Sequence, residues 1–162
     1  MSEKFTINPA TSAQDVLDAT KLFEAYAKSL GIDLTYQDFA TEMSSMPGKY
    51  SPPTGALLLA RDAHGHPIGC VGVRPLEGRF CEMKRLYVSP EGRGMGLGRA
   101  LAERVVEDAR GLGYRAMRLD TLASLRAAFA LYKKLGFREI GAYYQTPLEG
   151  TVFMELELGN DR

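Results

Sequence analysis

The sequence predicts a mixed α/β layer architecture, and three observations lead to that prediction. Three strand patterns follow one another from Ala56 to Val88, with turn residues between them. After Phe80 the patterns alternate between strand and helix, which is typical of mixed α/β folds. The chain has 162 residues, of which 45% are hydrophobic, so it is long enough to build one core. We therefore expect residues 1–162 to form a single domain.

The N-terminal part of the chain begins with a predicted amphipathic helix. Thr11 and Ser12 are both suitable caps, and apolar residues then recur at steps of three and four until Gly31. A second, shorter helix is expected from Tyr36 to Ser44. From Gly48 to Gly55, adjacent prolines fix φ and remove donors, so we expect a stiff loop without regular structure. The expected apolar face of the first helix includes Val16, Leu17, Ala19, Phe23, Tyr26, Ala27 and Leu30.

Three strands are expected next, from Ala56 to Arg61, from Pro67 to Arg74 and from Arg79 to Val88. The turn sequences Asp62-Ala63-His64-Gly65 and Pro75-Leu76-Glu77-Gly78 separate them. Because short turns connect strands that run in opposite directions, the three strands should form an antiparallel meander.

Beyond Val88 the pattern changes to a glycine loop, Ser89 to Gly98, and then to a helix that ends near Gly111 and Gly113. The expected apolar face of this helix includes Leu101, Val105, Ala109 and Leu112. The elements that follow are a strand from Ala116 to Thr121, a helix from about Leu125 to Leu135, and strands near Phe137–Ile140 and Val152–Leu158.

The charge balance and the cysteine content exclude several classes of protein. Twenty Lys and Arg residues balance 20 Asp and Glu residues, so no net charge favours nucleic acid or an anionic membrane. Two cysteines, Cys70 and Cys81, are too few for a disulfide framework. The first residues do not resemble a secretory signal, and the apolar run from Ala56 to Ala60 is too short to span a bilayer. A cytoplasmic protein without nucleic-acid or membrane partners is expected.

A strand, a glycine loop and a helix in succession can bind phosphate, because backbone N–H groups and the positive end of the helix dipole point at the loop. Glycines stand at positions 92, 94, 96 and 98. This spacing excludes the Gly-x-Gly-x-x-Gly dinucleotide fingerprint, because Leu97 or Arg99 stands where its last glycine is required. The chain also lacks the Gly-Lys-Ser/Thr of a P-loop. Taken alone, the loop is equally compatible with a flexible connection.

Three motifs stand in order between Cys70 and Ile140. The loop reads Arg93-Gly94-Met95-Gly96-Leu97-Gly98 and fits the Arg/Gln-x-x-Gly-x-Gly/Ala signature of the GNAT superfamily of acetyl-CoA-dependent N-acetyltransferases. The segment from Glu82 to Pro90 resembles the central strand of that family. Leu131-Tyr132-Lys133-Lys134-Leu135-Gly136-Phe137 resembles its Leu-Tyr-x-x-x-Gly-Phe motif. The resemblance implies the GNAT-type acyl-CoA N-acyltransferase fold, a mixed, mostly antiparallel sheet (α/β, also described as α+β) flanked by helices on both faces.

The resemblance implies acetyl-CoA as co-substrate, with its pyrophosphate at the glycine loop. Glycines there allow a close approach of the backbone and leave N–H groups free, and Arg93 and Arg99 would add positive charge. The pantetheine arm would lie along the preceding strand, where Leu86 and Val88 offer backbone groups, and would enter through a splay beside that strand. The cofactor-binding residues implied are Leu86, Tyr87, Val88, Arg93, Gly94, Met95, Gly96, Leu97, Gly98 and Arg99.

The resemblance also implies two catalytic residues. Tyr132 occupies the motif position whose hydroxyl lies near the sulfur, and it would protonate the leaving thiolate; the alternative is packing or a hydrogen bond to the cofactor. Glu82 would receive the proton of the acceptor amine; the alternative is a solvated or salt-bridged carboxylate. Strict alternation, unless a bulge interrupts it, separates the residues of this strand into two faces. One face is expected to hold Glu82, Lys84, Leu86 and Val88, and the other Cys81, Met83, Arg85 and Tyr87.

In GNAT proteins the N-terminal helices and the loop after them form walls of the acceptor pocket. This implies Tyr26, Tyr36, Tyr50 and the Pro52-Pro53 loop as candidate substrate contacts, with packing as the alternative for each. Asp120, at the end of its strand, is a second carboxylate that would orient the acceptor. Many family members have Asn where this chain has Leu125, so a polar role is not expected there.

Weaker signals concern the remaining charged residues and histidines. His64 and His66 lie in a predicted turn without a third ligand nearby in the sequence, so no metal is expected. The pairs Lys84-Arg85 and Lys133-Lys134 are interpreted as solvated faces, with contact to CoA phosphates as the alternative.

The sequence therefore predicts an N-acetyltransferase that moves an acetyl group from acetyl-CoA to a primary amine of a small molecule, such as an amino acid, by direct transfer in a ternary complex. The neutral charge balance argues against lysine-rich protein tails as acceptors. Two alternatives stay open: acetylation of a protein lysine or N-terminus, and a non-catalytic acyl-CoA sensor. The oligomeric state is also open, and a homodimer is one form considered.

Overall fold

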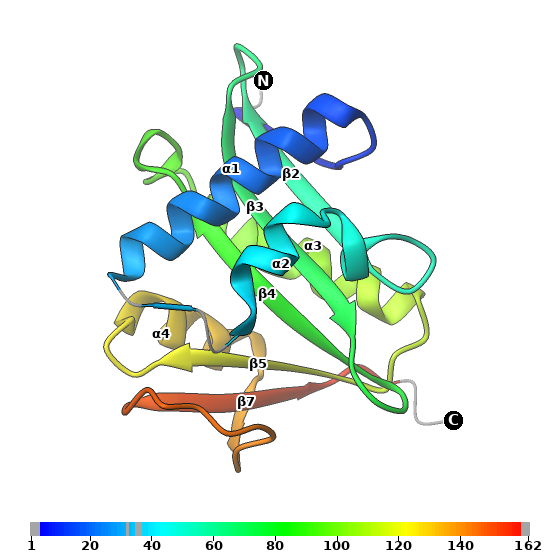
Figure 1. Ribbon diagram of the computed structural model, residues 1–162, viewed down its shortest axis with the longest axis vertical. Helices are drawn as coiled ribbons and strands as arrows, with labels where there is room; N and C mark the ends of the chain where they lie inside the picture. Colours follow the sequence, from blue (N-terminus) through cyan, green and yellow to red (C-terminus); the bar gives the residue numbers. More distant parts are fainter. Residues whose placement is uncertain (1–3, 32, 35–36, 160–162) are drawn as a thin grey trace.

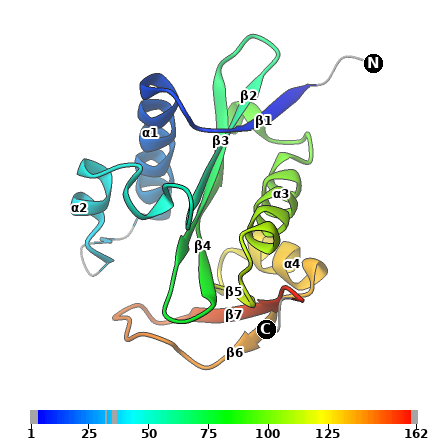
Figure 2. The same ribbon diagram turned by 90° about the vertical axis from the view of Figure 1, so that its right-hand side faces the viewer.

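The computed structural model describes residues 4–31, 33–34 and 37–159. Its centre is a seven-stranded sheet with the strand order β1-β2-β3-β4-β5-β7-β6. Helices α1 and α2 lie on one face of this sheet and helices α3 and α4 on the other (Figures 1 and 2). All pairs of neighbouring strands are antiparallel except β4 and β5. The predicted fold class, a mixed and mostly antiparallel sheet with helices on both faces, is confirmed.

Helix α1 (Ala13–Leu30) forms where the sequence predicts it, because both of its ends are specified locally. The Ser12 Oγ accepts a hydrogen bond from the Asp15 backbone N–H at 3.0 Å, and the Asp15 carboxylate accepts one from the Ser12 N–H at 3.3 Å. This reciprocal capping box satisfies backbone donors that the first helical turn leaves free. Gly31 ends the helix in the left-handed conformation, with φ at 65°.

Two expectations for the N-terminal part need correction. Strand β1 (Phe5–Pro9) was not predicted, because its short, mixed sequence becomes an edge strand only by pairing with β2. The segment after Gly48 is not wholly irregular: it begins with a 3₁₀ turn, η2 (Gly48–Tyr50), which Pro47 can precede because the first turn of a helix needs no donor at that position. The second predicted helix is α2 (Phe39–Ser44), while Tyr36 lies outside the described residues.

The predicted meander is confirmed. Strands β2 (Ala56–Asp62), β3 (Pro67–Pro75) and β4 (Phe80–Val88) run antiparallel in sequence order. They form the middle of the sheet together with β5 (Ala116–Leu122).

The second half of the chain alternates as predicted. The turn η3 (Pro90–Gly92) follows β4 and leads through the glycine loop to α3 (Leu97–Gly111). Helix α4 (Arg126–Leu135) follows β5. The chain then forms the short strand β6 (Arg138–Ile140) and ends in β7 (Thr151–Glu157), which inserts between β5 and β6.

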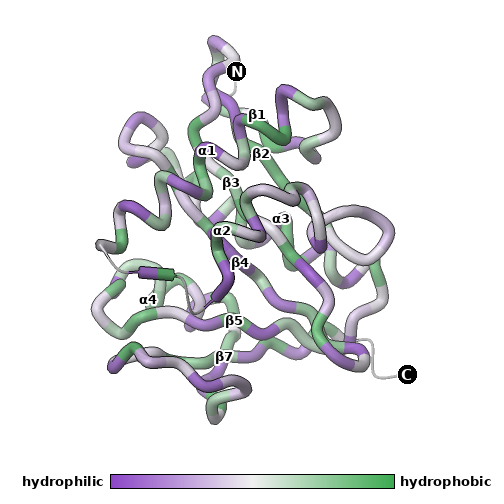
Figure 3. Tube along the Cα trace, viewed as in Figure 1, coloured by the Kyte–Doolittle hydropathy of each residue, from purple (hydrophilic) through white to green (hydrophobic). Residues whose placement is uncertain are grey.

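Each face of the sheet has its own hydrophobic cluster. On one face, α3 packs Leu101 and Val105 against Val71, Met83 and other side chains of the central strands. On the opposite face, α1 packs Phe23 and its neighbours against Tyr50 of η2 and the strands below. Figure 3 shows hydrophobic colouring along β2 and β3 and hydrophilic colouring on the middle of β4. The middle of β4 is therefore polar, whereas the neighbouring strands β2 and β3 are mainly apolar.

Burial differs from the expected apolar faces at two positions. Leu17 of α1 is 48% exposed, and Leu112, which follows the last residue of α3, is 40% exposed. Leu112 lies beyond the end of its helix, so helical periodicity does not direct it to the sheet. Both cysteines are buried, and burial raises the pKa of the Cys70 and Cys81 thiols, the latter to about 12.

Within residues 4–31, 33–34 and 37–159, no helix combines the length and the apolar character that a membrane crossing requires.

A first prediction concerns the contact between β3 and Tyr50. A Cβ added at Gly72 would lie 2.6 Å from the Tyr50 Cδ1, and Tyr50 is 1% exposed, so the ring cannot move outward freely. We expect Gly72→Ala to lower the free energy of unfolding by about 1–3 kcal/mol, measured by urea denaturation. In the control Gly111→Ala the new Cβ meets nothing within 4 Å. Equal stability of the two variants would contradict the prediction.

Candidate functional site

The site begins where strands β4 and β5 part. Their parallel pairing runs only from Phe80 opposite Ala116 to Glu82 opposite Arg118, whereas β4 continues to Val88. The splay that the sequence analysis expected is therefore confirmed. Beyond the last paired residues lies an open groove of about 430 Å³, bounded by the end of α1, the end of β4 and the start of α4. The groove is mainly apolar.

A β-bulge in β4 decides which side chains face this groove. Cys70 lies opposite Tyr87, but Gly72 lies opposite Lys84, so β4 has an extra residue between these pairs. Arg85 has a φ of 62°, which is unusual for a residue other than glycine.

The bulge corrects the strict alternation expected for β4. Leu86 and Val88 pack against the cluster on the α3 face, together with Met83. Tyr87 packs instead against the cluster on the α1 face, and Arg85 forms its ion pair with Glu42 of α2. Glu82, Lys84 and Arg85 thus form polar contacts within one network, which strict alternation does not allow.

Five of the ten predicted cofactor-binding residues line the groove: Leu86, Tyr87, Val88, Arg93 and Gly98. The other five do not. Leu97 is 1% exposed and its side chain packs in the core, while the Arg99 side chain is 58% exposed and pairs with Glu103 at 3.1 Å. Met95 packs partly against the core. Leu97 can therefore contact a cofactor through its backbone groups but not through its side chain.

The glycine loop has the geometry of an anion site. Gly94 and Gly96 have φ values of 84° and 74°, and a Cβ at either would meet nothing within 4 Å. Gly96 is the N-terminal cap of α3 and provides no side-chain hydrogen bond. The first turn of a 15-residue helix thus lacks a side-chain cap beside an open loop. Such free N–H groups, together with the helix dipole, favour a bound phosphate.

Tyr132 lies on α4, and it does not itself line the groove. Its side chain is 7% exposed, and its ring packs edge-on against Phe137 with the centroids 5.7 Å apart. With Lys84, Leu86 and Asp120 it lines a small pocket of about 50 Å³. Burial raises the pKa of Tyr132 well above its usual range, so its hydroxyl keeps the proton near neutral pH.

Glu82 is salt-bridged, which is the alternative that the sequence analysis left open. It is 2% exposed; its Oε1 accepts a hydrogen bond from Arg74 Nε at 2.9 Å, and its Oε2 accepts one from the Tyr143 hydroxyl at 2.6 Å. Both oxygens therefore have partners. Its assignment as the general base stays a prediction.

Asp120 lies across the splay from Lys84. The Lys84 ammonium is 3.6 Å from Asp120 Oδ2, and the same oxygen accepts a hydrogen bond from the Tyr144 hydroxyl at 2.9 Å. Lys84 Nζ also donates to Gln37 Oε1 at 3.3 Å. Burial lowers the pKa of Lys84, although Asp120 and Glu82 act to raise it.

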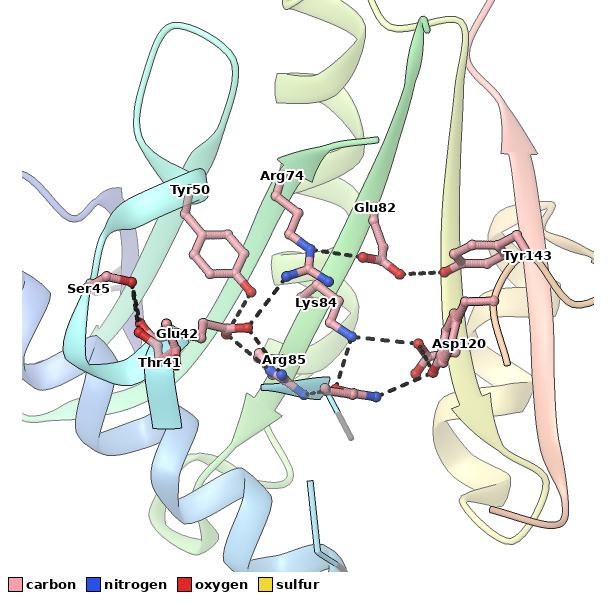
Figure 4. A network of polar contacts seen from close by, with 12 residues as sticks. Thr41, Glu42, Ser45, Tyr50, Arg74, Glu82, Lys84, Arg85, Asp120 and Tyr143 are labelled. Carbon is pink, nitrogen blue, oxygen red and sulfur yellow. Dashed lines mark hydrogen bonds and ion pairs between the residues drawn. The ribbon is translucent and has the colours of Figure 1, made fainter. Parts of the chain in front are cut away.

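A network of charged side chains joins α2 to the splay (Figure 4). Glu42 accepts hydrogen bonds from Arg85 at 3.2 and 3.3 Å and from the Tyr50 hydroxyl at 2.9 Å. Arg74 Nη1 is 3.5 Å from Glu42 Oε1, and its Nε binds Glu82. Beside Glu42 and Arg74 lies a cavity of about 160 Å³.

Sequence reasoning missed most of this network. Lys84 and Arg85 were interpreted as a solvated pair or as CoA-phosphate contacts, but both are 5% exposed and they point to α2 and β5. Two adjacent charges in the middle of a predicted central strand were the signal that could have indicated a buried site. The missed functional candidates are Glu42, Arg74, Lys84, Arg85, Tyr143 and Tyr144.

The predicted acceptor contacts lie in different places. Tyr26 lines both the groove and the small pocket, with its ring edge-on to Tyr87 at 6.0 Å. Tyr50 is buried in the α1-side cluster, and only its hydroxyl joins the network. Leu125 lines the groove and the small pocket as an apolar residue. Pro52 and Pro53 line neither.

Among the residues that the structure describes, no three His, Cys, Asp or Glu side chains form a cluster suited to a metal ion.

The comparisons with known proteins agree with the geometry. A model of the acetyltransferase (GNAT) family matches residues 19–137, so the chain belongs to this family. It is 43% identical over 154 residues to an uncharacterized N-acetyltransferase of Schizosaccharomyces pombe, covering 94% of each chain. It is 34% identical over 135 residues to the N-acetylaspartate synthetase of Danio rerio, covering 82% of this chain and 48% of that relative. A GNAT-family acetyltransferase of Staphylococcus aureus has the same fold, with a TM-score of 0.78, 19% identity and coverage of 95% and 99%.

A second prediction concerns the pH dependence of the network. Burial acts to raise the pKa of Glu42, but Arg85, with Tyr50 and Arg74, lowers it below the ordinary value of 4.5. The ionised carboxylate therefore stabilises the folded protein above that value, and this contribution is lost as the pH falls through the lowered pKa. Glu42→Gln should lower the free energy of unfolding by roughly 3 kcal/mol near neutral pH, because it leaves buried Arg85 without its charged partner.

The loss of stability in Glu42→Gln should shrink when urea denaturation is repeated at successively lower pH below 4.5, because the wild type loses the stabilisation by its ionised carboxylate there. Glu24→Gln, which changes an exposed carboxylate on α1, is the matched control and should stay close to wild type. If the difference in unfolding free energy between Glu42→Gln and the wild type is the same at every pH tested, the charge of Glu42 is not the cause of that difference.

Proposed function

We propose that the protein transfers an acetyl group from acetyl-CoA to a primary amine of a small molecule, an amino acid or a related metabolite, by direct transfer in a ternary complex. The main support is that an open groove along the end of β4 shares Tyr26, Leu86 and Leu125 with a small polar pocket, which Tyr132 also lines. A long co-substrate and a small acceptor could approach each other from these two sides. We also propose that residues 1–162 act as one domain.

The residues around the groove suit acetyl-CoA. The free N–H groups of the glycine loop and the start of α3 would hold the pyrophosphate, and Arg93 would add positive charge. The backbone of β4 at Leu86 and Val88 has no β5 partner and would pair with the amides of pantetheine. Acetyl-CoA supplies an acetyl group activated as a thioester.

Tyr132 is proposed as the proton donor. The new N–C bond forms as the C–S bond breaks, and the departing sulfur takes up a proton. The Tyr132 hydroxyl is protonated near neutral pH, so it has a proton to pass to the departing sulfur and then regains one from solvent. Burial raises the pKa of Tyr132, which makes it a weaker acid than an exposed tyrosine. Since a thiolate is already a fair leaving group, with a pKa near 8.5 in water, this donation accelerates transfer without being indispensable.

Two carboxylates, Glu82 and Asp120, are proposed to act on the acceptor amine in different ways. Glu82 keeps its proposed role as general base, acting through water because Arg74 and Tyr143 occupy its oxygens. Asp120 lines the pocket beside Tyr132 and is proposed to orient the amine. A small acceptor is supported by the limited volume of this pocket, about 50 Å³, and by the amino-acid product in the name of the Danio rerio relative.

A third prediction tests the proton donor. Tyr132→Phe should lower kcat for acetyl transfer by about tenfold to a hundredfold, because it removes the proton donor, and should leave the Kd for CoA within about twofold. Free-thiol release and calorimetry measure the two quantities. Tyr114→Phe also deletes a tyrosine hydroxyl, one that donates to the Thr54 carbonyl at 2.5 Å, and it should keep wild-type kcat.

A change in CoA affinity without a change in kcat would remove the acid role from Tyr132. Saturable CoA binding by the wild type, with no thiol release for any amine, amino acid or lysine peptide, would instead identify a non-catalytic sensor. Failure to bind CoA would contradict the assignment of the groove.

A further inference from the structure

Lys84 and Asp120 face each other across the splay, and each side chain has a polar atom that lacks a close partner among the described residues. Lys84 is 5% exposed, yet its polar contacts are long: 3.6 Å to Asp120 and 3.3 Å to Gln37. In a hydrogen bond from an ammonium to a carboxylate, the nitrogen and the oxygen are usually about 2.7–2.9 Å apart. An ammonium group also has three N–H donors, each of which needs an acceptor when the group is buried. The Lys84 cation is therefore buried without a close anionic partner in the part of the chain that the structure describes.

Asp120 has the complementary property. Its ion pair and its hydrogen bond within the described residues both use Oδ2, which lies 3.6 Å from Lys84 Nζ and accepts from the Tyr144 hydroxyl at 2.9 Å. Oδ1 has no hydrogen-bond partner among the described residues, and the side chain is 17% exposed. An open carboxylate oxygen thus lies beside an under-coordinated ammonium, and both residues line the same small pocket as Tyr132.

The charges of the surrounding network already cancel. Arg74, Lys84 and Arg85 are balanced by the carboxylates Glu42, Glu82 and Asp120. All six belong to the network drawn in Figure 4. Adding a cation or an anion alone to such a buried, balanced site leaves one charge uncompensated, which costs free energy. A molecule with one positive and one negative group avoids that cost.

We infer that the acceptor is an α-amino acid whose carboxylate binds Lys84 and whose amino group binds Asp120. The two ends of the zwitterion replace the long contact between Lys84 and Asp120 with two shorter ones. Tyr144 holds Asp120 in place, and Gln37 holds Lys84. This inference rests on the proposed function and makes Lys84 a specificity-determining residue. Polyamines, aminoglycosides and lysine peptides carry extra positive charge without the adjacent carboxylate, so the pocket should reject them.

The loss of Lys84 should act on the carboxylate and not on the amine. Burial lowers the pKa of Lys84, and the carboxylate of a bound amino acid would stabilise its charged form. This attraction between ammonium and carboxylate is what a substitution of Lys84 removes. A variant without the ammonium therefore loses affinity for the amino acid, while its affinity for an analogue that lacks the carboxylate stays unchanged.

The test compares matched compounds on the full chain saturated with CoA. Calorimetry measures the Kd of each common L-amino acid, of its C-terminal amide and of its decarboxylated amine, and free-thiol release from acetyl-CoA is recorded for the same set together with spermidine and a lysine peptide. At least one amino acid should bind about tenfold or more tightly than its amide and its amine, as expected for one charge-assisted contact.

Lys84→Met should weaken binding of that amino acid by about tenfold and leave its amide within twofold. Lys21→Met, at an exposed position on α1, is the matched control and should change neither. If Lys84→Met does not fold, Lys84→Gln serves the same purpose, and the comparison of compounds on the wild type decides the question by itself.

Each outcome is decisive. Binding of the amide or the amine as tight as that of the amino acid, or no binding of any amino acid, overturns the inference. So does an equal loss for all compounds in Lys84→Met. Selective, Lys84-dependent binding of an amino acid without thiol release supports the amino-acid site while the proposed transfer fails. Thiol release with spermidine or the peptide alone has the opposite meaning: the transfer stands and the inference fails.

Discussion

Most of the architecture depends on how the sheet is held together where its hydrogen-bond ladder stops. Strands β4 and β5 pair only as far as Glu82 and Arg118, and beyond that point backbone groups cannot bridge the gap. Side chains take over: Lys84 reaches Asp120, and Tyr143 reaches Glu82 from the segment between β6 and β7. Because these groups are polar and buried, each needs a hydrogen-bond partner or a group of opposite charge. The same interruption that weakens the sheet therefore creates a buried polar pocket.

The bulge at Arg85 makes this arrangement possible. It places Lys84 and Arg85 in one network on the α2 side of the sheet, and it directs Leu86 and Val88 toward the apolar cluster at the groove. One extra residue thus separates a charged half of β4 from an apolar half. A molecule with a long apolar arm and a polar acceptor would each meet the surface that suits it. The positive φ of Arg85 is a local cost that the ion pair with Glu42 helps to offset.

The sequence was sufficient for features that depend on near neighbours. The cap of α1 involves Ser12 and Asp15, three positions apart, and the meander follows from short turns. The family motifs also led to the splay and to five residues of the groove. Strand β1, the bulge and the partners of Glu82 were not predictable in this way. Tyr143 lies 61 positions from Glu82, and Gln37 lies 48 from Arg85, so only the folded chain brings them together.

The two cysteines acquire a practical meaning from their positions in the central strands. Cys70 and Cys81 are both 0% exposed, and burial raises their pKa, so neither thiolate nor access is available in the folded chain. The cysteines of the native protein should thus not react with thiol-directed reagents. They should become reactive only when the sheet opens at β3 and β4. Reaction of the cysteine thiols can then be used to follow that opening. In an assay of thiol release, the buried cysteines of the folded protein do not add to the signal of the released co-substrate thiol.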